Sequence, residues 1–263
     1  MTKPADSSSF SCVRETISGA FRTVFLLSNH PKTMLLQKLR QEVLEANLEL
    51  VRRGLVLYTF GNASGISRQD KLIVIKPSGV PYAEMKPEHL VVTDLTGKIV
   101  EGFLRPSSDL PTHVELYRAF PKIGGVAHTH SEYATSWAQA RKPIPCFGTT
   151  HADYFYGPVP VTRALTRKEI ASDYEKNTGT AIVRAFKGLD YMAVPAVLVA
   201  NHAPFTWGPD IAAAAHNAVI LESVARMAYF TTGINPRAQG TGRHLLDKHY
   251  LRKHGKDAYY GQR

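Results

Sequence analysis

The sequence predicts an α/β protein: a single layered α/β/α domain built around a central, mostly antiparallel or mixed sheet. Short apolar segments bounded by glycine, proline and asparagine predict strands, and these come both as hairpins and next to helices. Longer segments carry apolar residues at three- and four-residue steps and predict amphipathic helices. This mixture favours a layered mixed sheet over a purely parallel doubly wound one.

The first half of the chain alternates between the two kinds of segment. A periodic helix begins at Met34 and ends at Gly54, and a small-residue loop is expected at 61–65. Strands are predicted at 55–60 and 71–75, a hairpin at 90–93 and 99–101 around Thr96-Gly97, and a helix at 111–120.

The second half is richer in helix. Strands are predicted at 124–130 and 196–200, and helices at 133–140, 211–230 and 245–254, with a mostly helical stretch at 166–186. The order of these elements is that of one domain, because no internal repeat and no long linker divides them.

Composition limits the class of protein. The 263 residues are 44% apolar, which suffices for one sizeable core. The net charge of +10 is scattered along the chain, which fits a solvated surface or a site for an anionic small molecule better than a nucleic-acid interface. Two cysteines make no disulfide framework, and no apolar run is long enough to cross a membrane. We therefore expect a cytoplasmic protein with neither nucleic acid nor membrane as partner.

Residues 1–33 differ from the rest. They contain a serine run at 7–9 and a short apolar run at 24–27 that comes too late for a secretory signal. We expect the domain to cover residues 34–263. Residues 1–33 would then be a disordered extension, or the result of a start codon assigned upstream of Met34.

The pair His128-Thr129-His130 carries the strongest chemical signal. Residues two apart on a strand point to the same face, so the two imidazoles would project side by side. Imidazole is the commonest protein ligand for zinc and related ions. The alternative is a chance pair on a surface strand.

Three further polar clusters are candidates. Asp109 follows Ser107 and Ser108 and could be a metal ligand or a plain helix start; His202 follows an apolar strand and could be a ligand or a satisfied strand-end histidine. Asp153, in a polar segment at 148–154, is a candidate general acid or base, or part of an ordinary loop.

Together these clusters resemble a known family. The motifs G-N-x-S at 61–64, K-P-S-G at 76–79, P-S-S-D at 106–109, H-T-H at 128–130, G-T-T-H-A-D-Y at 148–154, H-x-P-F at 202–205 and K-H-Y-x-R-K-H-G-x-x-A-Y-Y-G-Q at 248–262 resemble the L-ribulose-5-phosphate 4-epimerase family. That family is a branch of the class II aldolase/adducin-like group. The resemblance runs from about Met34 to the C-terminus, with departures at Gly65 and Ala203.

The resemblance implies a role for each matching residue. The metal ligands, usually of zinc with manganese or cobalt as substitutes, would be Asp109, His128, His130 and His202. The phosphosugar would be held by Gly61, Asn62, Lys76, Ser78, Gly79, Ser107 and Ser108, with Thr149 in support. Asp153 and Tyr260 would be the acid/base pair.

The implied reaction is the interconversion of L-ribulose 5-phosphate and D-xylulose 5-phosphate. It would proceed by retro-aldol cleavage of the C3–C4 bond into an enediolate and glycolaldehyde phosphate, followed by bonding to the other face of the aldehyde. The resemblance also implies a homotetramer with active sites between subunits, so that Tyr260, near the C-terminus, would complete a neighbour's site.

Two alternatives stay open from the sequence. One is a class II aldolase of the L-fuculose-1-phosphate type, and the other is a non-catalytic module like the adducin head. The pathway served, whether arabinose, ascorbate or another pentose, also stays open.

Overall fold

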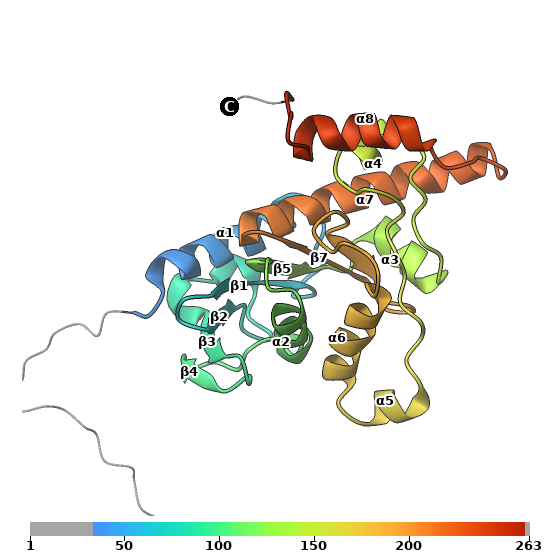
Figure 1. The fold of residues 1–263 in the computed structure, drawn as a ribbon. Helices are drawn as coiled ribbons and strands as arrows, with labels where there is room; N and C mark the ends of the chain where they lie inside the picture. The colour runs from blue at the N-terminus through green and yellow to red at the C-terminus, as the bar shows by residue number, and fades with distance from the viewer. Residues whose placement is uncertain (1–33, 261–263) are drawn as a thin grey trace, which may run out of the picture. The chain divides into compact units, whose positions relative to one another are not determined.

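The computed structural model describes residues 34–260, so the predicted extension at 1–33 lies outside the described residues. Within this range one sheet has seven strands in the order β4-β3-β2-β1-β5-β7-β6 (Figure 1). The strands are β1 (Asn62–Ser67), β2 (Leu72–Ile75), β3 (Val91–Asp94), β4 (Ile99–Glu101), β5 (Gly125–His128), β6 (Ala196–Leu198) and β7 (Pro204–Gly208). All neighbouring strands pair antiparallel, which confirms the predicted fold class.

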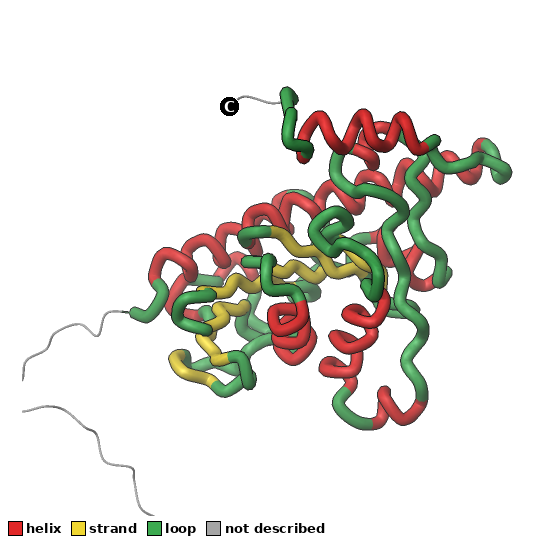
Figure 2. The backbone as a smooth tube through the Cα atoms, in the orientation of Figure 1, coloured by secondary structure: helices red, strands yellow, loops and turns green. Residues whose placement is uncertain are grey.

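Helices lie on both sides of the strands (Figure 2). They are α1 (Gln37–Arg52), α2 (Leu110–Ala119), α3 (Glu132–Gln139), α4 (Thr149–Ala152), α5 (Arg167–Ala171), α6 (Tyr174–Ala185), α7 (Ile211–Ile234) and α8 (Arg243–His254), with single 3₁₀ turns at Tyr82–Glu84 and Pro87–His89. None of the helices between residues 34 and 260 has the length and apolar character needed to cross a membrane.

Two apolar clusters cover the two faces of the sheet. Val74 belongs to the cluster under α1 and the first half of α7. Its neighbours Ile73 and Ile75 belong to the larger cluster formed with α2, α6 and the second half of α7. Strand side chains alternate between faces, so this division is what a sheet buried on both sides requires.

The segment at 55–65 corrects two predictions. Residues 55–60 form a loop rather than a strand, with Leu57 and Tyr58 exposed and Tyr58 at a φ of +53°. Four of the five residues of the expected loop at 61–65, those from Asn62 on, belong instead to the central strand β1. Small residues suit that position because α1 packs directly on it: a Cβ at Gly65 would lie 2.8 Å from Leu39 Cδ1.

The remaining predicted elements are present with shifted ends. The strand at 124–130 ends at His128, so His130 lies beyond β5. The stretch at 166–186 is helical but divides into α5 and α6. The strand β7 and the short helix α4 were not predicted.

Candidate active site

A pocket of about 390 Å³ opens where β1 begins and β2 and β5 end. The register pairs Asn62 with His128, so the antiparallel ladder itself places these two residues side by side. The pocket is lined by residues predicted to bind metal or phosphate: Gly61, Asn62, Lys76, Ser78, Gly79, Ser107, Ser108, Asp109, His128, His130 and His202. Residues 141 positions apart in the chain, from Gly61 to His202, thus meet at one edge of the sheet.

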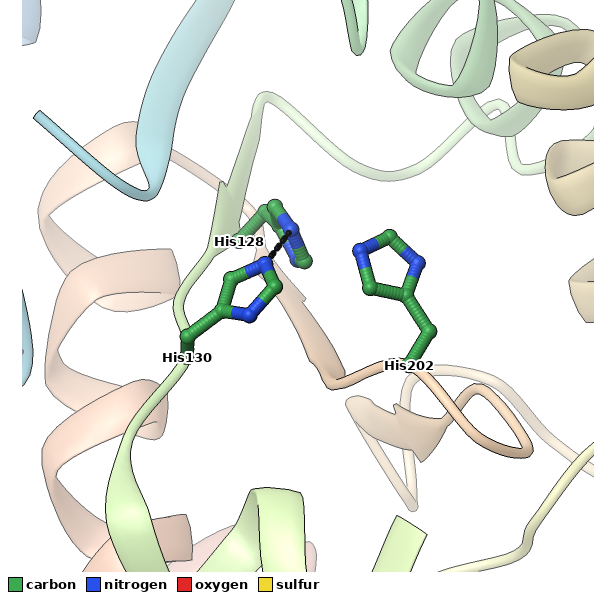
Figure 3. A group of neighbouring side chains, drawn as sticks. All are labelled: His128, His130 and His202. Atoms are coloured by element: carbon green, nitrogen blue, oxygen red, sulfur yellow. Dashed lines mark hydrogen bonds between the residues drawn. The ribbon is translucent and has the colours of Figure 1, made fainter. Parts of the chain in front are cut away.

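Three imidazoles converge in this pocket: His128 from the end of β5, His130 from just beyond that strand, and His202 from the turn before β7 (Figure 3). Their nearest ring nitrogens all lie within 4.8 Å of one another, and His128 Nε2 is 3.2 Å from His130 Nε2. His128 stacks on Phe205 with ring centroids 4.1 Å apart and donates from Nδ1 to the Pro204 carbonyl at 2.9 Å. That hydrogen bond leaves Nε2 as the ligand atom, which is how proteins usually fix a metal-binding tautomer.

Two of these imidazoles, His130 and His202, are neutral at pH 7. Burial, together with the neighbouring His128 and His130, lowers the pKa of His202 to about 4. Burial also lowers the pKa of His130. A neutral imidazole has the lone pair that a metal needs, so the group is ready for a cation at neutral pH.

Asp109 supplies a carboxylate beside the histidines. It precedes α2 but makes no side-chain capping bond, so its role is not that of a plain helix start. Instead Oδ2 accepts from Asn62 Nδ2 at 2.7 Å and lies 3.9 Å from His128 Nε2. Burial alone would raise the pKa of Asp109, but His128, His113 and the Asn62 amide together lower it. Three imidazoles and one carboxylate fit zinc or a similar divalent ion.

A buried hydrogen-bond network ties α2 to β1 and so holds Asp109 near Asn62. The Ser64 hydroxyl lies 2.6 Å from His113 Nδ1, and the Tyr117 hydroxyl donates to the Ser64 carbonyl at 2.8 Å. The side chains of His113 and Tyr117, both on α2, are buried. The start of β1 and the start of α2 are therefore fixed relative to each other.

The other end of the pocket suits an anion. Lys76 is buried and burial lowers its pKa to about 8, with Nζ 3.2 Å from the Pro77 carbonyl and 4.6 Å from the centre of the Tyr82 ring. The N–H groups of Ser78 and Ser107 donate to backbone carbonyls. The N–H groups of Gly79 and Ser108 have no partner within residues 34–260, so they are free to bind an oxyanion.

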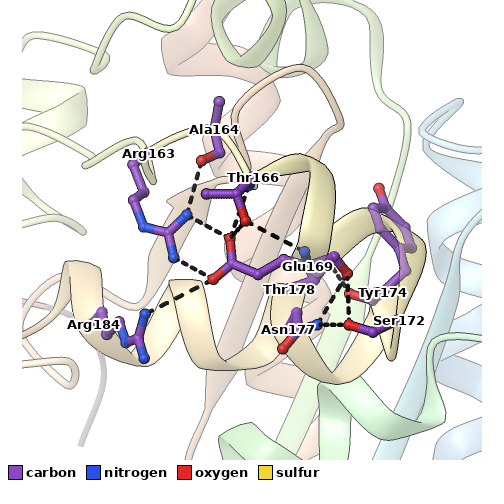
Figure 4. A network of polar contacts seen from close by, with 9 residues as sticks. All are labelled: Arg163, Ala164, Thr166, Glu169, Ser172, Tyr174, Asn177, Thr178 and Arg184. Carbon is purple, nitrogen blue, oxygen red and sulfur yellow. Dashed lines mark hydrogen bonds and ion pairs between the residues drawn. The ribbon is translucent and has the colours of Figure 1, made fainter.

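Five residues that line this pocket were not predicted as site residues: Thr59, Phe60, Pro77, Tyr174 and Glu175. The last two come from a part of the chain where no site was expected. Tyr174 and Glu175 begin α6, and the segment before them is held by Glu169, which accepts from Arg163 and from the Thr166 N–H (Figure 4). The T-x-x-E spacing at 166–169 is a capping box, and it signals the start of α5. The start of α6, which faces the pocket, has no side-chain cap, so no local signal marks it.

The other predicted site residues, Thr149, Asp153 and Tyr260, do not line this pocket. Asp153 follows α4, which packs against α8 above α7 in Figure 1. Its carboxylate accepts from Arg252 Nη2 at 2.8 Å and from His249 at 3.0 Å. The Arg252 guanidinium in turn lies 4.5 Å from the centre of the Tyr260 ring. Asp153 and Tyr260 thus belong to one cationic cluster, which we call the α4–α8 cluster: Asp153, His249, Arg252, Lys253 and Tyr260.

Solved structures show the same architecture. An L-fuculose 1-phosphate aldolase is 26% identical with a TM-score of 0.69, and the match covers 82% of this chain and 95% of that one. YgbL from Klebsiella pneumoniae, a candidate aldolase, epimerase or decarboxylase, is 26% identical with a TM-score of 0.65 over 81% of this chain and 97% of its own. The L-fuculose-1-phosphate aldolase of Thermus thermophilus, 21% identical with a TM-score of 0.61 over 78% of this chain and 100% of its own, shares the fold.

The sequence itself also matches a family model. The model is described as the class II aldolase and adducin N-terminal domain, and it covers residues 41–229. That range contains most of α1, the whole sheet and every residue of the pocket. The chain therefore belongs to the class II aldolase and adducin N-terminal domain family.

Proposed function

We propose that this protein is a zinc-dependent L-ribulose-5-phosphate 4-epimerase, which interconverts L-ribulose 5-phosphate and D-xylulose 5-phosphate. The observation that supports this best is the single pocket that holds both a three-histidine, one-carboxylate donor set and an anion-binding end. A phosphorylated ketopentose needs both at once, because its phosphate and its ketone are at opposite ends of a short chain.

The pocket residues would bind and orient the sugar phosphate. Gly79, Ser108 and the serine hydroxyls would donate to the phosphate, with Lys76 as counter-charge. Asn62 Oδ1 is buried without a partner among the described residues, and it would accept from a substrate hydroxyl. Asp109, His128, His130 and His202 would hold the divalent ion, which supplies Lewis-acid polarisation of the ketone when bound.

Asp153 would take the proton from the C4 hydroxyl of one of the two epimers, whose C4 oxygen becomes the aldehyde oxygen when the C3–C4 bond breaks. Burial alone would raise its pKa, but hydrogen bonds from Arg252 and His249 lower it, so Asp153 is a carboxylate at neutral pH. Tyr260 would exchange the proton with the C4 oxygen on the opposite face. Two groups are needed because the aldehyde presents its two faces in turn.

The α4–α8 cluster lies outside the pocket of its own chain, so we propose a homotetramer in which one subunit's cluster completes the neighbour's pocket. Two inactive variants test this, His130→Ala in the pocket and Asp153→Asn in the cluster. If the site is shared, mixed tetramers assembled from equal amounts would regain activity at about a quarter of their sites. Mixtures as inactive as the parents would place both groups in one subunit.

A coupled assay tests the reaction. Purified protein with zinc receives L-ribulose 5-phosphate, and D-xylulose 5-phosphate and free glycolaldehyde phosphate are followed with and without chelator. The epimerase predicts chelator-sensitive xylulose phosphate with little free aldehyde. No turnover and no bound metal would contradict the proposal.

The second candidate is an aldolase, favoured by the 26% identity to an L-fuculose 1-phosphate aldolase. The same assay separates the two, because an aldolase releases its fragments. Accumulating aldehyde with L-ribulose 5-phosphate, or cleavage of L-fuculose 1-phosphate at a higher kcat/KM, would establish the aldolase instead.

A further inference from the structure

The turn that presents His202 has an unusual backbone. It joins β6 to β7, and the His202 N–H donates to the Val199 carbonyl at 2.9 Å while the Val199 N–H donates to the Ala203 carbonyl at 3.0 Å. Asn201, directly before His202, has a φ of +63°. Asparagine tolerates this left-handed conformation better than most residues, but glycine adopts the conformation more readily still.

The same turn is tied to the end of α3. The Asn201 N–H donates to the Ala138 carbonyl at 3.0 Å, and Asn201 Oδ1 accepts from Arg141 Nε at 2.9 Å. Arg141 also has a positive φ, +55°, where the chain leaves α3. The left-handed Arg141 ends α3 in the usual way, because its N–H donates to the Ala138 carbonyl and the Lys142 N–H donates to the Trp137 carbonyl. The side-chain hydrogen bond from Arg141 to Asn201 therefore links this rigid helix end to the turn that carries His202.

We infer that Arg141 and Asn201 are positioning residues that hold His202 in its metal-binding place and so set how tightly the pocket holds a divalent ion. Neither residue lines the pocket, so neither can act by touching metal or substrate. They act through the backbone, because the left-handed turn at Asn201 decides where the next side chain starts. This inference rests on the proposed metal centre.

Metal binding is sensitive to such placement. A zinc–imidazole bond is about 2.0–2.1 Å long and tolerates deviations of only about 0.2 Å. The His202 ring reaches the other two histidines at centroid separations of 4.9 and 5.1 Å. A small rotation at Asn201 would therefore carry the ring out of ligand distance while the strands on either side stay paired.

The test measures the zinc dissociation constant of the full chain by competition with a chromophoric chelator, together with the melting temperature of the metal-free protein. Arg141→Ala and Asn201→Ala should each weaken zinc binding about tenfold. This is the lower end of the range of affinity losses seen when residues that orient metal ligands are changed. Asn201→Gly keeps the left-handed turn but loses Oδ1, so its loss should match that of Arg141→Ala. The matched control is Lys71→Ala, which changes an exposed left-handed residue in the β1–β2 turn, and it should leave zinc affinity unchanged.

The double variant Arg141→Ala/Asn201→Gly completes the test. If the two side chains act through their one hydrogen bond, removing both should cost no more than removing one. The double variant should then bind zinc no more weakly than whichever single variant has the lower zinc affinity. Wild-type affinity in both Arg141→Ala and Asn201→Ala would overturn the inference while leaving the metal centre intact. An equal loss in Lys71→Ala would also overturn it, because the effect would then be general destabilisation. Failure of the wild-type chain to bind zinc would instead remove the proposed centre itself.

Discussion

Replacing Lys76 by methionine should make the folded protein more stable and the pocket less active. The Lys76 side chain is 2% exposed, and it forms no ion pair with any residue between 34 and 260. Its neighbours are one carbonyl and the face of Tyr82. Methionine has similar length and no charge, so it removes the cost of burying an ammonium group.

The size of the effect follows from the pKa. Burial lowers the pKa of Lys76 from 10.5 to about 8, and such a change corresponds to about 3 kcal/mol against the charged form. Solvent that enters the pocket screens part of this cost, so we expect the Lys76→Met variant to gain about 1–2 kcal/mol at pH 7.

The pH dependence has a definite sign. Between pH 8 and 10.5 the folded protein has released the Lys76 proton while the unfolded chain still holds it. The unfolded state therefore binds more protons, and the stability of the wild-type protein rises with pH in this window. The advantage of Lys76→Met should shrink from pH 7 to pH 10.5.

Urea unfolding of the metal-free protein at several pH values measures this, with exposed Lys71→Met as the control. At pH 7 the kcat/KM for a sugar phosphate should fall in Lys76→Met and stay unchanged in Lys71→Met. A Lys76→Met protein less stable than wild type, or a stability difference independent of pH, would refute the reasoning.

Three further predictions concern other parts of the molecule. The Tyr174 hydroxyl lies 3.4 Å from His202 Nδ1, and because this contact is long, Tyr174→Phe should weaken zinc binding by about tenfold at most; a loss beyond about a hundredfold in a chelator competition would show that we have its role wrong. Gly65→Ala places a Cβ 2.8 Å from Leu39 Cδ1 and should cost about 1–3 kcal/mol in urea unfolding; unchanged stability would mean that α1 can move away. Asp153→Asn should lower kcat and leave zinc stoichiometry at the wild-type value, since Asp153 does not line the pocket; metal analysis showing lost zinc would contradict that separation.

Local patterns predicted most of the fold because they act over a few residues. The hairpin at 90–93 and 99–101 and the helices α1 and α8 follow from turn residues and three- and four-residue periodicity. The same rules failed at 55–65, where apolar Leu57 and Tyr58 imitate a strand. The small residues of β1 form the real strand because α1 must pack on them, and packing is not a local property.

The site was partly readable in the same way. The alternation argument brought His128 and His130 together, and their rings are 4.9 Å apart, although His130 lies beyond the strand on which the argument relied. Tyr174 and Glu175 could not be found, because a helix start carries no sign of what it faces.

By itself, the sequence determined which chemical groups are available for binding: imidazoles, a carboxylate, and the serines and glycines suited to phosphate. It also contains the motifs that mark the family. Only the tertiary structure decided that these groups share one pocket while Asp153 and Tyr260 lie in a separate cluster. The physical reason is that residue type and spacing act locally along the chain. The convergence of Asn62, His128 and His202 depends instead on the register of β1 and β5 and on the turn before β7, which form only when the whole sheet is assembled.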